Sequence, residues 1–530
     1  MNGIRPLLLI IAFLQSLTSL SQSNVDVLHY KFEIELSDNS DTVKGRAFVS
    51  VKFLENANKF SLDLVSSSHG KGMIAYSVTE NNSELTFTQG NDQLVISLRT
   101  PAQRNDTTTF EVDYMGVPND GLIISRNKYG DRTFFADNWP NRAHNWIPCK
   151  DEPDDKATSE FLVTAPAQYQ VISNGKLKEE KALPGNKKLT HWYEDVALPT
   201  KVMVIGAGKF AIKEFPDSPP NIPVSAWVYP QDSVSGFRNY SPAPEIVKFY
   251  SNYIGPYPYN KLANVESKTK FGGMENASAI FYNEESAEQK ESIEDLLAHE
   301  IAHQWFGDMA TERSFPHLWL SEGFATYFAD LYLESKYGTG ALNERLKEER
   351  NKVIDFIRVS GKPVVDSVSV FMKLLSPNSY ERGAWVLHML RREIGDSSFQ
   401  VVIRNYYSRY KNKNADTDDF RKIVEEVTGK DFHQFFKQWL FTSEIPRLNI
   451  QSKYNKDAEQ LVLTVNQLQR EIFQFPLQFE FESETQKGKT VNVQISQQTE
   501  TFKFKVDKKL HRLIVDPGTS LLFEEVKNKF

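Results

Sequence analysis

The sequence predicts a multidomain α+β protein, with β-rich regions at both ends and a mostly helical region between them. Short runs of alternating apolar and polar residues fill the first part of the 530-residue chain, helical periodicity dominates the middle, and alternation returns near the C-terminus. A chain of this length is too long for a single hydrophobic core. We therefore expect an N-terminal β-rich domain at 22–232, a helical domain at 233–445 and a small C-terminal β-sandwich at 446–530.

The first 21 residues have the pattern of a secretory signal peptide. Arg5 precedes an apolar run at 7–14, and the small residues Ser19 and Ser21 stand before Gln22. This run is shorter than a membrane-spanning helix, and no other segment approaches about 20 consecutive apolar residues. We expect cleavage after residue 21, a secreted or periplasmic location and no integral membrane segment in the mature chain. An uncleaved N-terminal anchor is the alternative.

Strand patterns occupy most of the region from 30 to 211. The runs at 46–51 and 110–114 alternate apolar and polar residues, and Asn, Asp, Ser and Gly separate such runs. A Pro-rich break at 216–220 is followed by one further apolar run at 224–228. These features predict a β-rich domain that ends shortly before the helical region begins.

Helical periodicity follows from about residue 233. It predicts helices at 245–254 and 384–393, a helix capped by Thr417 that extends to residue 427, and the two helices that carry the motif described below. Beyond Pro446, short alternating runs reappear. They lie at 461–465, 491–495, 502–506 and 513–517, and they predict the small β-sandwich.

Two histidines four residues apart, His299 and His303, form the most informative motif of the chain. Helical positions with this spacing lie on one face, about 6 Å apart, so both imidazoles can bind one ion. The segment is predicted to be helical, because Ser292 can cap it, an apolar stripe follows and Gly307 can end it. Glu300 is poorly placed as a third ligand, but it can reach a water molecule held by the metal. The spacing predicts a zinc site with its own general base.

A third protein ligand is expected, because catalytic zinc sites usually hold three protein ligands and keep one position open. Glu322 is the candidate, since it lies in the first turns of a second helical run, 318–337, which Gly338 closes. An antiparallel pair of helices would aim this carboxylate at the two imidazoles. The alternative is that these histidines and carboxylates are ordinary residues of a helical region.

Charge and cysteine content narrow the function further. The net charge of −7 and the lack of a basic stripe argue against nucleic acid as a partner. Cys149 is the only cysteine, so no disulfide can form within the chain. Because no paired base is evident near it, we expect a buried structural thiol and not a nucleophile.

Three further segments accompany the zinc motif. They are Gly272-Gly273-Met274-Glu275-Asn276, the stretch WIPCKDEPDDK at 146–156, and Ser379-Tyr380-Glu381-Arg382-Gly383-Ala384. Together with the zinc motif they resemble the aminopeptidase N family of zinc metallopeptidases, which includes the leukotriene hydrolase. The resemblance extends over nearly all of the predicted mature chain. It implies a saddle-like N-terminal domain, a thermolysin-like catalytic domain and one Zn²⁺ per chain.

The resemblance also implies how a peptide is bound. Family members use the segment at 272–276 as a strand edge beside the metal. Backbone groups of Gly272, Gly273 and Met274 would pair with an extended peptide, and Glu275 would bind its free α-amine. Paired glycines permit a close approach of backbones, and a carboxylate offsets the cost of desolvating an ammonium group.

Two more residues are interpreted through the same resemblance, and Arg382 is interpreted separately. Tyr380 matches the tyrosine that donates a hydrogen bond to the oxyanion during water attack. Asp137, five residues before Arg142, takes the position of a second amine anchor, where relatives commonly carry Gln or Glu. We interpret Arg382 as a surface charge.

These observations predict a secreted zinc aminopeptidase that acts on peptides with a free N-terminal amine. His299, His303 and Glu322 would hold the zinc, with Glu300 as general base and Tyr380 as oxyanion donor. Epoxide hydrolysis of the leukotriene hydrolase type and a catalytically inactive binding scaffold are the alternatives. Many relatives carry a large helical domain after the catalytic region, and its lack in this sequence predicts a more open cleft.

Overall fold

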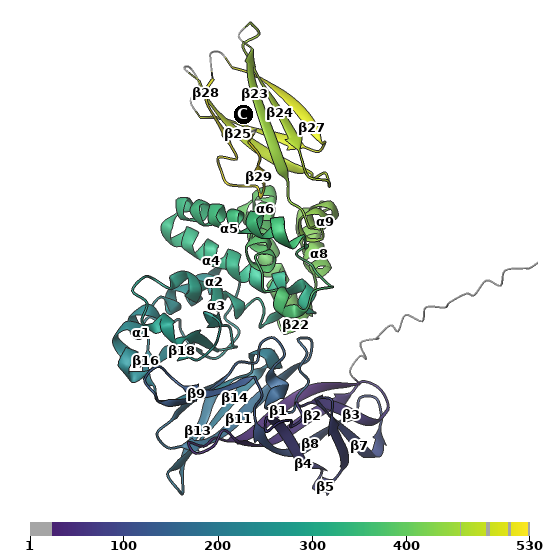
Figure 1. The fold of residues 1–530 in the computed structure, drawn as a ribbon, viewed down its shortest axis with the longest axis vertical. Helices are drawn as coiled ribbons and strands as arrows, with labels where there is room; N and C mark the ends of the chain where they lie inside the picture. Colours follow the sequence, from purple (N-terminus) through teal and green to yellow (C-terminus); the bar gives the residue numbers. More distant parts are fainter. Residues whose placement is uncertain (1–23, 456, 484–487, 507–509, 528–530) are drawn as a thin grey trace, which may run out of the picture.

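A computed structural model describes residues 24–455, 457–483, 488–506 and 510–527. Three regions follow one another along the long axis of the molecule: a β-rich N-terminal region, a helical middle region and a β-rich C-terminal region (Figure 1). The multidomain α+β fold is therefore confirmed. The predicted signal peptide at 1–21 lies outside the described residues.

The N-terminal region is built on an eight-stranded sheet with strand order β13-β14-β11-β1-β2-β8-β4-β5. Its strands are β1 Val25–Glu35, β2 Val43–Phe53, β4 Gly72–Glu80, β5 Ser83–Glu84, β8 Thr107–Val117, β11 Lys156–Pro166, β13 Lys176–Leu183 and β14 Lys187–Pro199. Buried residues alternate with more exposed ones along β1, β2 and β11, as the sequence pattern predicted. In this sheet β1 and β11 pair in parallel, which joins segments more than one hundred residues apart.

Two smaller sheets complete this region. One has the order β12-β15-β10-β9 and the other the order β3-β7-β6. Their strands are β3 Ala57–Asp63, β6 Thr86–Gly90, β7 Gln93–Ala102, β9 Leu122–Arg126, β10 Arg132–Ala136, β12 Gln170–Ser173 and β15 Ile205–Gly208; the short helices η1 Ala143–Asn145 and η2 Thr200–Val202 lie between strands. Cys149 is fully buried in this region with a free thiol, as predicted.

A five-stranded sheet opens the middle region, with the order β16-β17-β18-β20-β19. Its strands are β16 Ala211–Glu214, β17 Val224–Val228, β18 Leu262–Ser267, β19 Gly273–Met274 and β20 Ala279–Asn283. The predicted domain boundary at 232 cuts through this sheet, because β17 pairs in parallel with β18. β16 and β17 thus belong with the helical region, although both precede that boundary.

Helices make up the rest of the middle region. They are η3 Pro230–Asp232, α1 Ser233–Asn239, α2 Ala243–Tyr253, η4 Glu284–Ala287, α3 Glu294–His303, η5 Phe315–Leu320, α4 Glu322–Tyr337, α5 Thr339–Ser360, η6 Phe371–Lys373, the π-helical turn η7 Asn378–Arg382, α6 Gly383–Ile394, α7 Asp396–Tyr410, α8 Thr417–Thr428 and α9 His433–Leu440. A two-stranded sheet pairs β21 Ala310–Glu312 with β22 Lys413–Ala415.

Several predicted helix boundaries differ from the structure. α3 has Ile293 as its N-cap and ends at His303, so neither Ser292 nor Gly307 directly bounds it. The predicted run at 318–337 consists of η5 and α4, and α4 ends at Gly338 as expected. α8 is capped by Asp416 and not by Thr417, since Asp416 and Asp419 exchange side-chain and backbone hydrogen bonds as a capping box. The hydroxyl of Thr417 instead accepts a hydrogen bond from Nε1 of Trp319 at 2.9 Å.

The C-terminal region contains two sheets, with the orders β27-β24-β23-β29 and β26-β25-β28. Their strands are β23 Arg447–Asn455, β24 Gln460–Gln467, β25 Phe475–Ser483, β26 Lys489–Ile495, β27 Thr499–Lys505, β28 Leu510–Val515 and β29 Glu524–Glu525. Phe481 of one sheet meets Phe504 of the other, with ring centroids 5.2 Å apart. The two sheets therefore face each other, in agreement with the predicted β-sandwich.

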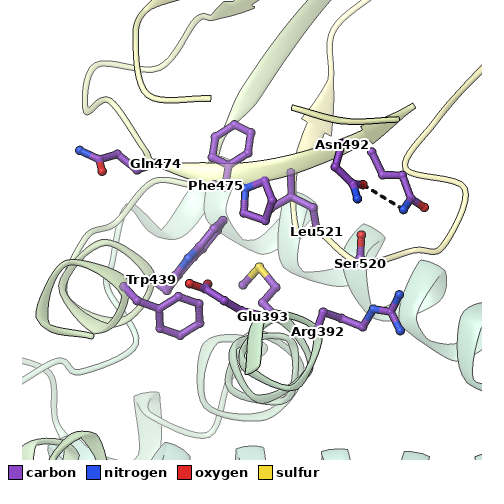
Figure 2. Close-up of a pocket in the computed structure, with 12 residues that line it drawn as sticks. Arg392, Glu393, Trp439, Gln474, Phe475, Asn492, Ser520 and Leu521 are labelled. Carbon is purple, nitrogen blue, oxygen red and sulfur yellow. Dashed lines mark hydrogen bonds between the residues drawn. The ribbon is translucent and has the colours of Figure 1, made fainter. Parts of the chain in front are cut away.

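The sandwich rests on the ends of α6 and α9 (Figure 2). Trp439 of α9 packs on Phe473, and a cavity of about 210 Å³ lies between the two regions. At the opposite end of the middle region, Lys156 of β11 donates hydrogen bonds to the carbonyls of Asp308 and Met309. Among the described residues, no helix combines the length and the apolar character needed to cross a membrane.

Candidate metal centre

The metal-binding side chains predicted from the sequence meet where α3 and α4 approach each other. His299 and His303 lie on α3, with their Nε2 atoms 3.2 Å apart. Glu322 begins α4, and its Oε2 lies 3.4 Å from Nε2 of His299 and 3.3 Å from Nε2 of His303. Three potential ligand atoms therefore face one common point.

This arrangement fits zinc. Nitrogen and oxygen ligands at about 2.0–2.1 Å from a tetrahedral zinc ion are separated from one another by about 3.3 Å, which is close to the three distances observed. Two imidazoles and one carboxylate are also a common ligand set for catalytic zinc. A second group consists of Glu275, Glu300 and His303. Their potential ligand atoms lie within 4.8 Å of one another, but this group offers only one imidazole. We therefore assign the zinc to His299, His303 and Glu322.

The pKa values of the three ligand side chains depend on burial and on their neighbours. Burial raises the pKa of Glu322, but the imidazoles of His303 and His299 outweigh this effect and lower it overall. Burial lowers the pKa of His303, yet Glu322 and Glu275 raise it to about 10. For His299, burial dominates and the pKa is lowered. The site thus favours an ionised carboxylate next to a positive charge, which zinc can provide.

The tautomer of His303 is set by groups behind it. Its Nδ1 lies 3.1 Å from the carbonyl oxygen of Phe306 and 3.1 Å from Oγ of Ser321. Because a carbonyl only accepts, Nδ1 carries the proton and the lone pair of Nε2 points to the metal position. Ser321 immediately precedes Glu322, so one turn orients two of the three ligands.

The turn that carries Tyr380 packs closely on the start of α4. A Cβ atom on Gly323 would lie 2.8 Å from the Cα of Gly383, so neither helix could carry a larger residue at this contact. The phenol ring of Tyr380 stacks on His299, with centroids 5.9 Å apart and an angle of 13°. Burial raises its pKa well above the usual value, and the carboxylates of Glu322 and Glu275 raise it further. The phenol is therefore a neutral hydrogen-bond donor.

Glu300 lies between the metal ligands and the strand β19. Its side chain is buried, and burial is the main cause that raises its pKa. A Cβ atom on Gly273 would lie 2.4 Å from the Glu300 carboxyl carbon. Any side chain at this position would displace the carboxyl group, so glycine keeps Glu300 in its observed place.

The segment with Glu275 follows the edge strand of the five-stranded sheet. β19 is the last strand of the sheet and pairs only with β20, so its other edge is unpaired in the described chain. Both of its residues, Gly273 and Met274, line the cavity described below. Glu275 is 3% exposed, and within the described chain its Oε1 has no hydrogen-bond partner. Burial is the main cause that raises its pKa. A buried carboxylate oxygen without a donor suits a cationic ligand group.

Gln304, directly after the metal ligand His303, ties this segment to α3. Its Nε2 donates to the carbonyl oxygen of Glu275 at 2.8 Å and to Oδ2 of Asp308 at 2.9 Å. Its Oε1 accepts from the backbone N–H of Ser278 at 2.7 Å. Gln304 is fully buried, and no motif in the sequence indicated its role.

One cavity of about 270 Å³ collects these groups. It is lined by every predicted site residue except Asp137: Gly272, Gly273, Met274, Glu275, His299, Glu300, His303, Glu322 and Tyr380. Four further residues line it that were not predicted from the sequence: Trp139, Phe271, Leu296 and Leu375. Phe271 directly precedes the Gly-Gly-Met-Glu-Asn segment, and this position could have identified it as a lining residue. Nothing in the local pattern marked Trp139 or Leu375.

The role of Asp137 as a second amine anchor stays a prediction. Asp137 does not line the cavity, and its Oδ1 accepts a hydrogen bond from the guanidinium of Arg142 at 2.6 Å. Burial raises its pKa, while Arg142 acts against this effect. The short side chain is thus held by its own loop, and Trp139, two residues later, reaches the cavity instead.

Two family models match the chain. The model of the peptidase family M1 domain matches residues 239–439, and that of the peptidase M1 N-terminal domain matches residues 27–202. Probable aminopeptidase 2 of Sulfurisphaera tokodaii is 28% identical over 396 residues, which cover 70% of this chain and 50% of that protein. The chain thus spans about half the length of this curated relative.

Solved structures with the same fold are more distant in sequence. Aminopeptidase A of Legionella pneumophila, in complex with aspartic acid, has a TM-score of 0.83 at 19% identity, and the match covers 97% of this chain and 61% of that one. A variant of the M1 zinc metallopeptidase of Deinococcus radiodurans, bound to a Tyr-Ser-Ala substrate, has a TM-score of 0.69 at 22% identity and matches 80% of this chain and 96% of its own. At these identities the likeness shows the fold.

Proposed function

This chain belongs to peptidase family M1, and from that premise we propose that it is a zinc-dependent aminopeptidase, which removes single residues from the N-terminus of peptides. One observation carries the proposal. A zinc-binding triad, a buried carboxyl, a neutral phenol donor and a carboxylate without a donor all line one cavity of about 270 Å³. A binding module would need no such combination.

The positions of the side chains indicate the role of each residue in the reaction. Zinc, when bound by His299, His303 and Glu322, supplies a Lewis acid that polarises the first peptide carbonyl and makes water easier to deprotonate. Glu300 takes a proton from the attacking water and passes it to the leaving amine. Tyr380 donates its O–H to the carbonyl oxygen as negative charge develops there.

Binding of the peptide terminus falls to the segment after β19. The unpartnered Oε1 of Glu275 is placed to accept hydrogen bonds from an α-ammonium group, which compensates both charges for the loss of water. The open edge of β19 can pair with the backbone of an extended peptide. The tripeptide bound to the Deinococcus relative supports peptides as the substrate class.

The proposal is tested with an amino acid coupled through its carboxyl group to a chromogenic amine. The protein should cleave the compound with a free α-amine and leave its N-acetylated counterpart intact, because the acetyl group removes the ammonium that Glu275 binds. Cleavage of both compounds would indicate an endopeptidase. Cleavage of neither by zinc-loaded protein would favour the binding scaffold, and hydrolysis of an epoxide without peptidase activity would favour the leukotriene hydrolase type.

The role of Glu300 is tested by Glu300→Gln. This variant should bind zinc in the same ratio as the unmodified protein and lose nearly all turnover, since glutamine cannot take up the proton. Glu348→Gln serves as the matched control, because Glu348 is exposed on α5 and lies away from the cavity lining. Substantial turnover by zinc-loaded Glu300→Gln would contradict the assignment of the base.

We also propose that the protein is exported, as a secreted or periplasmic enzyme. Arg5, the apolar run at 7–14 and the small residues Ser19 and Ser21 support this location. N-terminal sequencing of the protein from medium and periplasmic fractions should find Gln22 as the first residue. A protein that retains residue 1 and stays in the cytoplasm would contradict the proposal.

A further inference from the structure

Part of the active-site cavity has no role in the chemistry described above. After the metal ligands, Glu300, Glu275, Tyr380 and the two glycines are set aside, five side chains remain. They are Trp139, Phe271, Met274, Leu296 and Leu375, and all are apolar. Among the residues that line this cavity in the described chain, none is a lysine, arginine or aspartate.

The first side chain of a peptide has a restricted position in this cavity. Its Cα is bonded to both the α-amine, which Glu275 binds, and the carbonyl carbon, which lies at the metal triad. The side chain therefore starts between these two groups, and the rest of the peptide leaves past Glu300, which protonates the leaving amine. Met274 belongs to β19 and Leu296 to α3, so the apolar lining residues outside these two elements are Trp139, Phe271 and Leu375.

These three residues come from separate segments and are held in place. Trp139 is 2% exposed; its ring meets Phe271 edge-on at 6.2 Å, and its carbonyl accepts a hydrogen bond from Nε of Arg142 at 2.7 Å. Oγ of Ser379 donates to the carbonyl of Leu374 at 2.7 Å, which fixes the backbone next to Leu375. The apolar wall is thus already formed before a ligand binds.

The negative charges around the cavity disfavour peptides whose first residue is acidic. Glu275, Glu300 and Glu322 all face the cavity, and its lining offers no cation to a second carboxylate. A basic first residue would have to bury its charged head against Trp139 and Phe271 without a partner, because Asp137 is held by Arg142 outside the lining. Large apolar side chains bury their surface at no such cost.

We propose that this wall, formed by Trp139, Phe271 and Leu375, selects peptides whose first residue is aromatic or a large aliphatic residue such as leucine or methionine. The inference rests on the proposed aminopeptidase function. It assigns to Leu375 a direct contact with the side chain of the first residue.

The test is a panel of amino acids coupled to one fluorogenic amine, assayed with the full zinc-loaded chain. We expect kcat/KM for Phe and Leu to exceed that for Ala by about 10- to 100-fold, and that for Glu, Asp, Lys and Arg by about 100-fold or more. Values for Ala or for any charged residue at or above the value for Phe would overturn the preference. No cleavage of any member would instead overturn the aminopeptidase function itself.

Two substitutions test the assignment to Leu375. Leu375→Arg places a guanidinium on the wall and should raise the Glu/Phe ratio of kcat/KM by about tenfold or more. Leu375→Ser should lower the Phe/Ala ratio of kcat/KM about tenfold, because the serine no longer offers apolar surface to a large first side chain. Leu468→Arg is the matched control, since Leu468 is a 48% exposed leucine of the C-terminal region.

Zinc content and cleavage of the Ala compound show that each variant is folded. If both Leu375 variants keep the selectivity of the unmodified protein while they retain zinc and cleave the Ala compound, Leu375 does not contact the first side chain and the proposal is overturned.

Discussion

At the scale of single residues, Tyr380 shows how surroundings define a chemical role. Burial and the neighbouring carboxylates raise the pKa of the phenol well above its usual value. The hydroxyl therefore keeps its proton near neutral pH and can donate a hydrogen bond, but it cannot serve as a base. Its ring lies over the metal-binding imidazole of His299. A donor in this position contributes most when negative charge appears on the substrate oxygen.

Tyr380→Phe should therefore lower kcat without a comparable change in KM. Loss of one oxyanion donor costs about 2.7–4 kcal/mol in the transition state, or about 10²- to 10³-fold in kcat. Steady-state kinetics on a Phe or Leu substrate, together with zinc content, measures the effect. Tyr76→Phe, at a 58% exposed tyrosine of β4, is the control and should be unchanged. A Tyr380→Phe variant with normal kcat would exclude the oxyanion role.

At the scale of secondary-structure elements, the sequence predicted what local spacing determines. The spacing of His299 and His303 requires only that their segment be helical, and the periodicity predicted this helix. Arg382 shows the limit of the approach. Predicted as a surface charge, it is fully buried and donates to the carbonyls of Thr442 and Glu444, about sixty residues later. A partner so distant in the chain leaves no local pattern.

Asp137 and Trp139 show the same limit within the site. Both lie in the loop after β10, and the sequence could indicate that this loop approaches the metal. Which of the two side chains enters the cavity depends on the ion pair between Asp137 and Arg142 and on the packing of Trp139 against Phe271. These contacts are tertiary, so the sequence could not show that Trp139 lines the cavity.

Gln304 links two segments of the site whose separation must stay fixed. It joins α3, which carries the zinc ligands, to the segment with Glu275 through hydrogen bonds of 2.7 and 2.8 Å. Gln304→Met keeps the size of the side chain but removes these bonds. Because Glu275 is then free to shift, KM for a substrate with a free α-amine should rise about tenfold, while kcat changes less and the zinc content stays the same.

The matched control for this prediction is Gln438→Met. Gln438 of α9 is also buried and makes a two-way bridge, to the carbonyl and the N–H of Gln474. Both variants should lose stability by a similar amount, about 1–3 kcal/mol, because each leaves buried backbone groups without partners. Only Gln304→Met should raise KM. An equal effect of both on KM would reduce Gln304 to a purely structural role.

At the scale of the whole molecule, the order of the three regions could be predicted, but the contacts between them could not. The parallel pairing of β17 with β18 carries the sheet across the predicted boundary at 232. Local alternation identifies a strand but not its neighbour in the sheet. The junction with the C-terminal sandwich likewise depends on single polar contacts, among them the ion pair of Arg350 with Asp516 at 2.7 Å.

His388 lies at the centre of this junction. Its Nε2 donates to the carbonyl of Thr519 in the C-terminal region at 3.0 Å, and its Nδ1 accepts from the hydroxyl of Tyr327 at 3.1 Å. Acceptance by Nδ1 requires the neutral imidazole, because both ring nitrogens of a protonated histidine are donors. Burial lowers the pKa of His388 from 6.5 to about 3, and the positive charges of Arg391 and Arg392 act in the same direction.

This pKa makes the junction sensitive to acid. Below pH 6.5 an exposed histidine of the unfolded chain binds a proton, whereas the folded protein keeps His388 neutral until about pH 3. The contribution of His388 to stability is therefore complete above pH 6.5 and is lost progressively as the pH falls towards 3, by about 1.4 kcal/mol per pH unit. Between pH 7.5 and 5.0 the loss amounts to about 2 kcal/mol.

His388→Gln should remove this part of the acid sensitivity, because glutamine supplies a donor and an acceptor but does not titrate in this range. Urea unfolding followed by tryptophan fluorescence reports on the junction, since Trp385 lies 5.5 Å from His388 between ring centroids. From pH 7.5 to 5.0 the unmodified protein should lose about 2 kcal/mol more than the variant. His433→Gln, at an exposed histidine of α9, should behave like the unmodified protein. Equal losses in the unmodified protein and in His388→Gln would show that His388 does not cause the acid sensitivity of this junction.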